Sequence, residues 1–139
     1  VVKGATAGLR IPPPAATART DELWKHTCFE AFIRPDAGLE YFEFNFSPST
    51  QWAAYRFTGY REGMSPAEPA APDIEVRSAA DRLQVNVTLD VGSLPATAWR
   101  LGLSAIVEEL GGGKSYWALA HARGKPDFHH ADAFTLELA

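Results

Sequence analysis

The amino-acid sequence predicts an all-β fold, namely a single antiparallel β-sandwich with Greek-key or jelly-roll-like connections. Aromatic and β-branched runs recur along the chain and are separated by clusters of Pro, Gly, Asp and Ser, which is typical of consecutive strands. Between residues 82 and 90, apolar and polar residues alternate, as they do in a strand with one buried face. No stretch longer than one turn has helical periodicity. Together these features favour two packed sheets without a long helix.

The densest strand signal lies between residues 23 and 60. We expect three consecutive strands there, at Trp24–Ile33, Tyr41–Phe46 and Gln51–Phe57, joined by turns at residues 35–38 and 47–50. Polar groups lie among the aromatic residues of this region: His26, Glu30, Glu43, Asn45 and Arg56. Such strands suit a sheet with a core on one face and a ligand surface on the other, and they equally suit a sheet whose second face is simply solvated.

The rest of the chain continues the pattern of short strands and turns. We expect an interrupted strand at Val1–Ile11, a hairpin of Asp73–Arg77 with Arg82–Asp90, a helical turn at Val91–Ala96, a hairpin of Trp99–Glu109 with Ser115–His121, and a last strand at Phe134–Leu138. Residues 62–72 and 122–133 read as irregular loops. The period-two pattern predicts these core residues: Phe29, Leu83, Val85, Val87, Leu89, Leu101 and Leu103.

Length and composition limit the classes of protein to be considered. The 139 residues suit one domain, residues 1–139, and because the sequence does not begin with Met we expect part of the N-terminal strand region to be missing. The net charge is −4 and no basic tract is present, so we expect no nucleic-acid partner. No apolar run has membrane-spanning length, and a lone Cys28 excludes an internal disulfide.

Three of the four histidines gather with an aspartate in one C-terminal segment, at positions His121, Asp127, His129 and His130. Imidazole and carboxylate groups can ligate zinc, copper or iron, and a metal-dependent hydrolase is the enzyme class that such a set would suit. Their spacing matches no metal motif, however. The alternative is that these side chains bind backbone groups and hold a long loop in place.

Two further pairs could carry chemistry. His26 and Cys28 would share a face of an extended strand, as a nucleophile pair needs, although packing explains Cys28 equally well. Glu30 and Glu43 lie on strands expected to be neighbours, and two carboxyl groups at the right separation can hydrolyse a glycoside. Glu30 could instead form a structural ion pair with Arg56.

The aromatic residues best suited to binding are Trp24, Trp52, Tyr55, Tyr60, Tyr116 and Trp117. Their flat faces can stack on a sugar ring or on a porphyrin, while neighbouring Asn, Glu, Arg and His side chains fix hydroxyl or carboxylate groups. Part of this set is expected to belong to the core instead.

Several blocks resemble one family. Leu23-Trp24 followed by Glu30-Ala31-Phe32-Ile33, the strand and turn at residues 41–49, and the segments at 115–121 and 124–130 resemble DOMON-like domains, which are similar to family 9 carbohydrate-binding modules. The resemblance implies a β-sandwich whose sheet holds a sugar or a haem and which is not itself an enzyme. Haem-binding relatives use a methionine with a histidine or lysine, and Met64 is the only methionine here. His26-Thr27 stands where sugar-binding relatives often have two aspartates.

We therefore expect a non-catalytic module that binds a carbohydrate or another small polar ring compound, without a metal or cofactor. A haem-binding or redox module, with Met64 and a histidine as axial ligands, is the alternative. The ligand is expected against the three-strand sheet of residues 24–57, with residues 121–130 folded over its rim. The expected ligand-binding residues are Trp24, His26, Asn45, Trp52, Tyr55, Arg56, His121, Asp127, His129 and His130.

Overall fold

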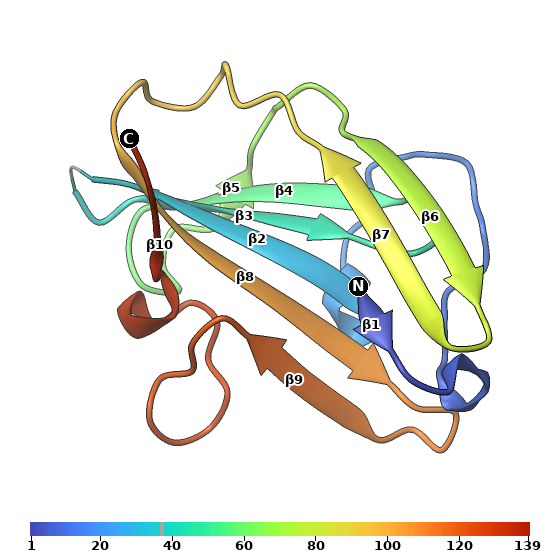
Figure 1. Ribbon diagram of the computed structural model, residues 1–139. Helices are drawn as coiled ribbons and strands as arrows, with labels where there is room; N and C mark the ends of the chain where they lie inside the picture. The colour runs from blue at the N-terminus through green and yellow to red at the C-terminus, as the bar shows by residue number, and fades with distance from the viewer. Residues whose placement is uncertain (37) are drawn as a thin grey trace.

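The computed structural model describes residues 1–36 and 38–139, and these form an all-β molecule with two antiparallel sheets that face each other (Figure 1). The large sheet has the strand order β10-β8-β2-β3-β4-β5, and β9 also pairs with β8. Its strands are β2 (Cys28–Pro35), β3 (Tyr41–Phe46), β4 (Trp52–Phe57), β5 (Ser65–Pro66), β8 (Trp99–Glu108), β9 (Lys114–Ala118) and β10 (Leu136–Leu138). The small sheet has the order β1-β7-β6, with β1 at Val2–Lys3, β6 at Asp73–Ala79 and β7 at Arg82–Thr88. The predicted all-β class and the antiparallel sandwich arrangement are confirmed.

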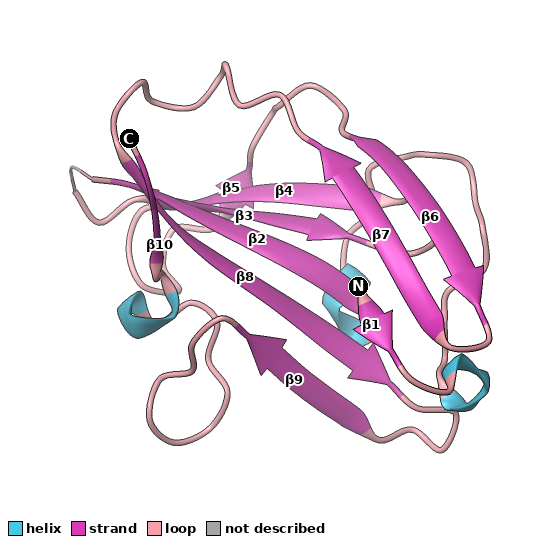
Figure 2. Cartoon of the chain, viewed as in Figure 1, coloured by secondary structure: helices cyan, strands magenta, loops and turns pink. Residues whose placement is uncertain are grey.

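Short 3₁₀ helices are the only helical structure among the described residues (Figure 2). They are η1 (Thr6–Gly8), η2 (Leu23–Lys25) and η3 (Ala131–Ala133). No helix in residues 1–36 and 38–139 is long and apolar enough to cross a membrane. The expected turn at residues 35–38 includes residue 37, which lies outside the described residues.

The inner face of the large sheet packs against the small sheet. Phe42, Phe44 and Phe46 alternate along β3 and point to this face, where they join Trp52 of β4 and Ile33 of β2 in one buried cluster. The small sheet contributes Ile74 and Val87 to the same cluster, with Leu89 just beyond β7. This cluster is the sandwich core proper.

The outer face of the large sheet is also buried, but loops rather than strands cover it. Phe32, Tyr41 and Phe57 form a second cluster there with Phe128 and Phe134 from the C-terminal segment. Because both of its faces are covered, every residue of β3 is buried. The interpretation in which the second face of this sheet is simply solvated is therefore wrong.

Both predicted hairpins are confirmed and several boundaries are corrected. β6 and β7 pair across a tight turn, and so do β8 and β9. The strand expected at Trp24–Ile33 begins only at Cys28, because residues 23–25 form η2, and the last strand begins at residue 136 instead of 134. The strand expected at Val1–Ile11 ends after Lys3, because Gly4 has a φ of 136° that no β-strand residue adopts. Residues 91–94 form a hydrogen-bonded turn instead of a helical turn.

The predicted core residues are only partly right. Leu83 is fully buried, and Leu101, Val87 and Leu89 pack against the inner cluster. Leu103 is 41% exposed and lines a groove together with residues of β1.

Candidate functional site

Three polar side chains on the outer face of the large sheet are buried. Glu30 of β2 stands opposite Asn45 of β3 in the strand register, and Glu43 lies two residues from Asn45 on the same face. All three alternate with apolar residues of the inner core, so the same period of two that buries Phe44 turns these polar groups to the other face. Asn45 Nδ2 donates to Glu43 Oε1 at 3.0 Å, and Ser104 Oγ donates to Glu30 Oε2 at 3.2 Å.

Two loops cover these residues and are joined to each other by Asp127. Arg61 Nη2 donates to Asp127 Oδ1 at 2.8 Å, and the hydroxyl group of Tyr60 donates to Asp127 Oδ2. The backbone N–H of His129 also donates to Asp127 Oδ1, at 3.2 Å. The 59–64 loop and the C-terminal segment are thus held together over the sheet.

His129 links this cover to the sheet below. Its Nδ1 lies 2.7 Å from the hydroxyl oxygen of Tyr41, which also accepts the backbone N–H of Arg61 at 3.1 Å. Since that hydroxyl hydrogen is then free to reach Nδ1, we assign the ring proton of His129 to Nε2, which lies 3.6 Å from Glu43 Oε2. The ring packs edge-on against Phe32 and Phe57.

Sheet and loops enclose a cavity of about 400 Å³, which we call the carboxylate pocket. Aromatic side chains form much of its wall, and two carboxyl groups, a guanidinium and an imidazole also face it. The residues that line it are Trp24, Glu30, Glu43, Phe57, Arg61, Met64, Ile106, Tyr116, Pro126, Phe128 and His129. Glu30 and Glu43, which stand on the sheet, form the floor of the pocket. Asn45 lies against this floor through its hydrogen bond to Glu43, and its Oδ1 is buried without any hydrogen-bond partner among the described residues.

Burial determines which titratable side chains of the pocket hold a proton at neutral pH. It raises the pKa of Glu30 to about 8, with a further rise from the charge of Glu43, so Glu30 is largely protonated at neutral pH. Burial also raises the pKa of Glu43, against the hydrogen bond from Asn45. Burial and the charge of Arg61 lower the pKa of His129 to about 4, so its imidazole is neutral at pH 7.

Five of the residues expected from the sequence lie in or beside the carboxylate pocket. Trp24 and His129 line it, Asn45 lies against its floor, and Asp127 holds its cover. Tyr55 is buried next to it, with its ring edge-on to Trp24 at 6.0 Å and its hydroxyl group donating to Asp21.

Five expected residues lie elsewhere. Trp52 and Arg56 point to the opposite face of the sheet, because side chains alternate between faces along β4 and these two alternate with Tyr55. Arg56 forms an ion pair with Glu40 rather than with Glu30. His26 is exposed, with Nδ1 2.7 Å from Glu108. His130 accepts the N–H of Asp132, and exposed His121 contacts Phe128, so neither lines the pocket. These five residues therefore do not share the carboxylate pocket with the others.

The expected ligand-binding set omitted several residues that line the carboxylate pocket, among them Glu30, Glu43 and Arg61. Tyr116, named from the sequence as an aromatic residue suited to binding, also lines the pocket, whereas Trp117 next to it lies on the opposite face of β9. No local signal indicates Arg61, whose partner Asp127 is 66 residues away.

The pocket fits haem poorly. Met64 and His129 both line it, which is the arrangement expected for an axial pair. However, Nδ1 of His129 is hydrogen-bonded to Tyr41 and Nε2 faces Glu43, so neither nitrogen is directed at an iron. Among the described residues, no group of three or more His, Cys, Asp and Glu side chains is arranged to hold a metal ion.

The His26–Cys28 pair does not form a nucleophile site. Cys28 is fully buried while His26 is exposed and bonded to Glu108. Burial raises the pKa of the Cys28 thiol well above its usual value, which disfavours the thiolate.

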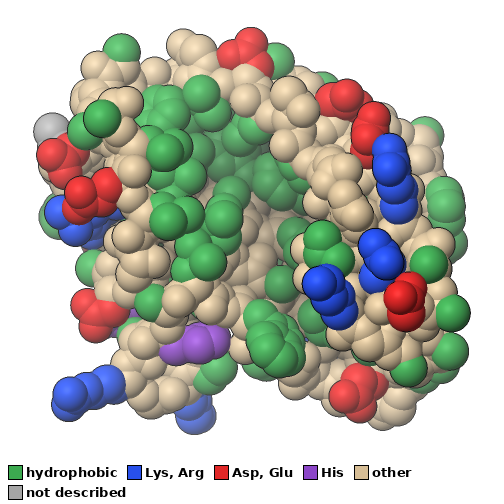
Figure 3. Space-filling model, viewed as in Figure 1, with side chains coloured by type: hydrophobic (Ala, Val, Ile, Leu, Met, Phe, Trp, Pro, Cys, Tyr) green, Lys and Arg blue, Asp and Glu red, His purple; other side chains and the backbone are tan. Residues whose placement is uncertain are grey.

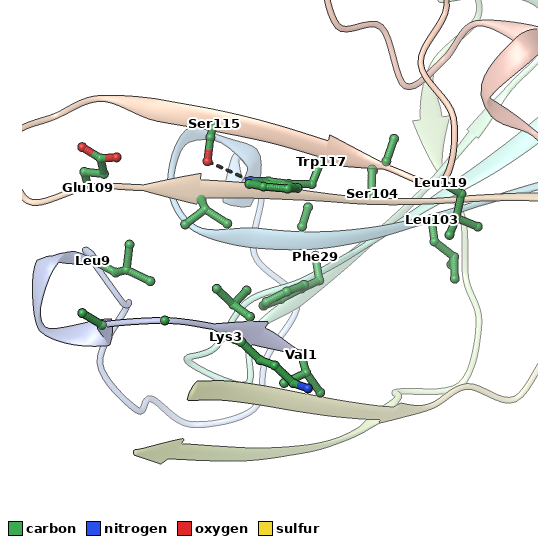
Figure 4. Close-up of a pocket in the computed structure, with 16 residues that line it drawn as sticks. Val1, Lys3, Leu9, Phe29, Leu103, Ser104, Glu109, Ser115, Trp117 and Leu119 are labelled. Carbon is green, nitrogen blue, oxygen red and sulfur yellow. Dashed lines mark hydrogen bonds between the residues drawn. The ribbon is translucent and has the colours of Figure 1, made fainter. Parts of the chain in front are cut away.

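A second, larger groove of about 510 Å³ lies on the opposite face of the large sheet, between β1, β8 and β9 (Figure 4). Phe29, Leu103 and Trp117 face it, and Trp117 Nε1 donates to Ser115 Oγ at 2.9 Å. Figure 3 shows the hollow on this face with hydrophobic side chains gathered beside it. None of the buried polar side chains of the described residues lines this groove, and its polar side chains, which include Lys3, Glu109 and Ser115, are not buried.

In comparisons with known proteins, no protein-family model, curated protein or solved structure matches this chain.

Proposed function

We propose that residues 1–139 form a non-catalytic ligand-binding module of the DOMON-like type, similar to family 9 carbohydrate-binding modules. The ligand is a carbohydrate or a similar polar ring compound, and it binds in the carboxylate pocket. One observation carries this proposal: Glu30, Glu43 and Asn45 form a polar floor beneath walls that include Trp24, Tyr116 and other aromatic rings. Aromatic faces stack on the C–H face of a sugar ring, while carboxyl and amide groups bind its hydroxyl groups.

A purely structural role does not explain this floor. A buried polar atom without a partner costs about 1–3 kcal/mol of stability, and Asn45 Oδ1 is such an atom. Glu30 and Glu43 are 6% and 5% exposed and have no Lys or Arg partner within 4.0 Å among the described residues. Apolar side chains at these positions would pack the sheet at lower cost, which supports a role in binding.

Binding is tested by screening purified protein on a glycan array and measuring the hits by isothermal titration calorimetry. Tyr116→Ala is expected to weaken binding by about 1–3 kcal/mol, as the loss of a stacked aromatic residue does. Trp117→Ala is the matched control, because the next residue along β9 is also an exposed aromatic but lines the opposite groove. A flat array with an intact fold, or equal losses for the two variants, would refute the proposal.

The carboxyl pair favours glycoside hydrolysis as a second candidate. A protonated Glu30 beside Glu43 is the kind of acid and base pair that such enzymes use. We expect no turnover, because both carboxyl groups lie at the floor with little solvent contact. Release of reducing ends from a bound oligosaccharide, lost in Glu30→Gln, would establish hydrolysis instead.

The haem alternative is tested by adding haem to the purified protein. Because Nδ1 of His129 is hydrogen-bonded to Tyr41 and Nε2 faces Glu43, we expect no shift of the Soret band. A shift that Met64→Leu abolishes would contradict this expectation.

A further inference from the structure

The carboxylate pocket contains more acid groups than cations. Glu30 and Glu43 line it and Asp127 holds its cover, whereas Arg61 is the one Lys or Arg among the residues that line it. The guanidinium of Arg61 is bonded to Asp127 at 2.8 Å, and His129 is neutral at pH 7. Buried acid groups are normally paired with a cation. Among the described residues no Lys or Arg lies within 4.0 Å of Glu30 or Glu43, and the more distant charge of Arg61 only partly offsets the rise that burial causes in their pKa values.

The floor also contains more hydrogen-bond acceptors than donors. Glu30 is 6% exposed, and its Oε2 accepts from Ser104 while its Oε1 has no hydrogen-bond partner among the described residues. Glu43 Oε2 has only the ring N–H of His129, at 3.6 Å, which is beyond hydrogen-bonding distance. Asn45 Oδ1 has no hydrogen-bond partner among the described residues. The proton of Glu30 supplies one donor, and a ligand that completes this floor must bring the others.

We propose that the ligand carries a protonated amino group, which binds between the carboxyl groups of Glu30 and Glu43. This inference rests on the proposed function and narrows it to amino sugars or related cationic ring compounds. An ammonium group supplies three donors and a positive charge, so it satisfies both deficits at once, whereas a hydroxyl group supplies one donor and no charge. The rings of Trp24, Tyr116 and Phe128 add a favourable environment for a cation.

Binding of such a group is coupled to a proton. In the free protein Glu30 holds a proton at neutral pH, and an ammonium group favours its carboxylate, so complex formation releases that proton to solvent. The titratable and charged groups near Glu30 are Glu43 from β3, Cys28 from β2, Tyr116 from β9, and Arg61, His129 and Asp127 from the loops. The Cys28 thiol stays neutral, and the charge of Arg61 is present in both states, so the exchanged proton belongs to the carboxyl pair of Glu30 and Glu43, whose pKa values are both raised by burial.

Calorimetry with glucosamine, N-acetylglucosamine and glucose tests the inference. The three rings differ only at one carbon, which carries an ammonium, an acetamide or a hydroxyl group, and at about pH 6 the amine of glucosamine is protonated. We expect glucosamine to bind at least about 10-fold more tightly than the other two, a difference of about 1.4 kcal/mol. Repeating the titration in buffers of different ionisation enthalpy at about pH 7 should show proton release on binding of glucosamine to the native protein.

Two variants test whether Glu30 and Glu43 are the residues that bind the amino group. Glu30→Gln is expected to lower the proton release, and Glu43→Gln to reduce glucosamine affinity about 10-fold more than it reduces glucose affinity. Glu62→Gln, on an exposed turn residue, is the matched control and should change neither. Equal binding of glucose and glucosamine would overturn the amine inference and leave the proposed function intact. Absence of binding by all three sugars, with a flat glycan array, would overturn both.

Discussion

The pH dependence of stability is the property that most directly tests the buried polar floor. Glu30 has a pKa of about 8 in the folded protein and 4.5 when exposed. Between those values the folded state holds a proton that the unfolded state has lost, so the free energy of unfolding falls as pH rises. His129 acts in the opposite direction. Its pKa falls from 6.5 to about 4 on folding, so stability rises with pH between about 4 and 6.5.

The contributions of Glu30 and His129 to the free energy of unfolding nearly cancel in one pH range, and outside that range only one of them changes with pH. Each contributes about 1.4 kcal/mol per pH unit within its own range. From pH 4.5 to 6.5 they oppose each other and we expect a plateau of stability. From pH 6.5 to 8 only Glu30 still titrates with this slope, and the expected loss is about 2 kcal/mol. The raised pKa of Glu43 adds a loss of the same sign, which begins above its usual pKa of 4.5.

Urea unfolding followed by tryptophan fluorescence at several pH values measures this profile. Glu30→Gln keeps the shape of the neutral side chain and cannot ionise, so it should remove the contribution of Glu30 to the loss between pH 6.5 and 8. Glu62→Gln, at an exposed position, should leave the native profile in place. If the native protein is equally stable at pH 6.5 and 8, or if Glu30→Gln loses stability as the native protein does, the argument for a buried, protonated Glu30 is refuted.

Three further predictions concern other parts of the fold. Tyr41→Phe removes the hydroxyl group between His129 and the N–H of Arg61, and should lower the free energy of unfolding by about 1–3 kcal/mol; an unchanged urea midpoint would contradict it. Phe44→Ala opens a cavity in the inner core and should cost about 3–5 kcal/mol in the same assay, and a loss below 1 kcal/mol would contradict the packing. Cys28 should resist thiol reagents at pH 8 until urea unfolds the protein, because it is fully buried and its pKa is raised; rapid labelling of the native protein would show otherwise.

The strands could be predicted because their signals are local. The alternation at Leu83, Val85 and Val87 gives both the strand and its buried face, and the turn residues around it give the hairpin. Boundaries were less reliable where tertiary contacts override the local pattern. Thr27, for example, donates its hydroxyl hydrogen to the carbonyl oxygen of Arg10 and accepts the N–H of Glu108, and the strand begins only after it.

The candidate site could be predicted only in part, because a period of two assigns side chains to faces and says nothing about what covers each face. The run from Tyr41 to Phe46 reads as a strand with one apolar and one mixed face, and such a face is ordinarily solvated. Here, contacts across 66 and 88 residues bring Arg61 to Asp127 and Tyr41 to His129, and these contacts bury the mixed face.

Burial changes the meaning of the polar residues on that face. On a solvated sheet, Glu43 and Asn45 would need no explanation, since water would satisfy them. Under the loops, each lost contact with water must be replaced, and the described residues replace only part of them, because Asn45 Oδ1 has no partner. The deficit is confined to the face that borders the carboxylate pocket, while the inner core on the opposite face is apolar. A ligand that donates hydrogen bonds and carries a positive charge would complete this floor, which is why the amine inference follows from the packing of the sheet.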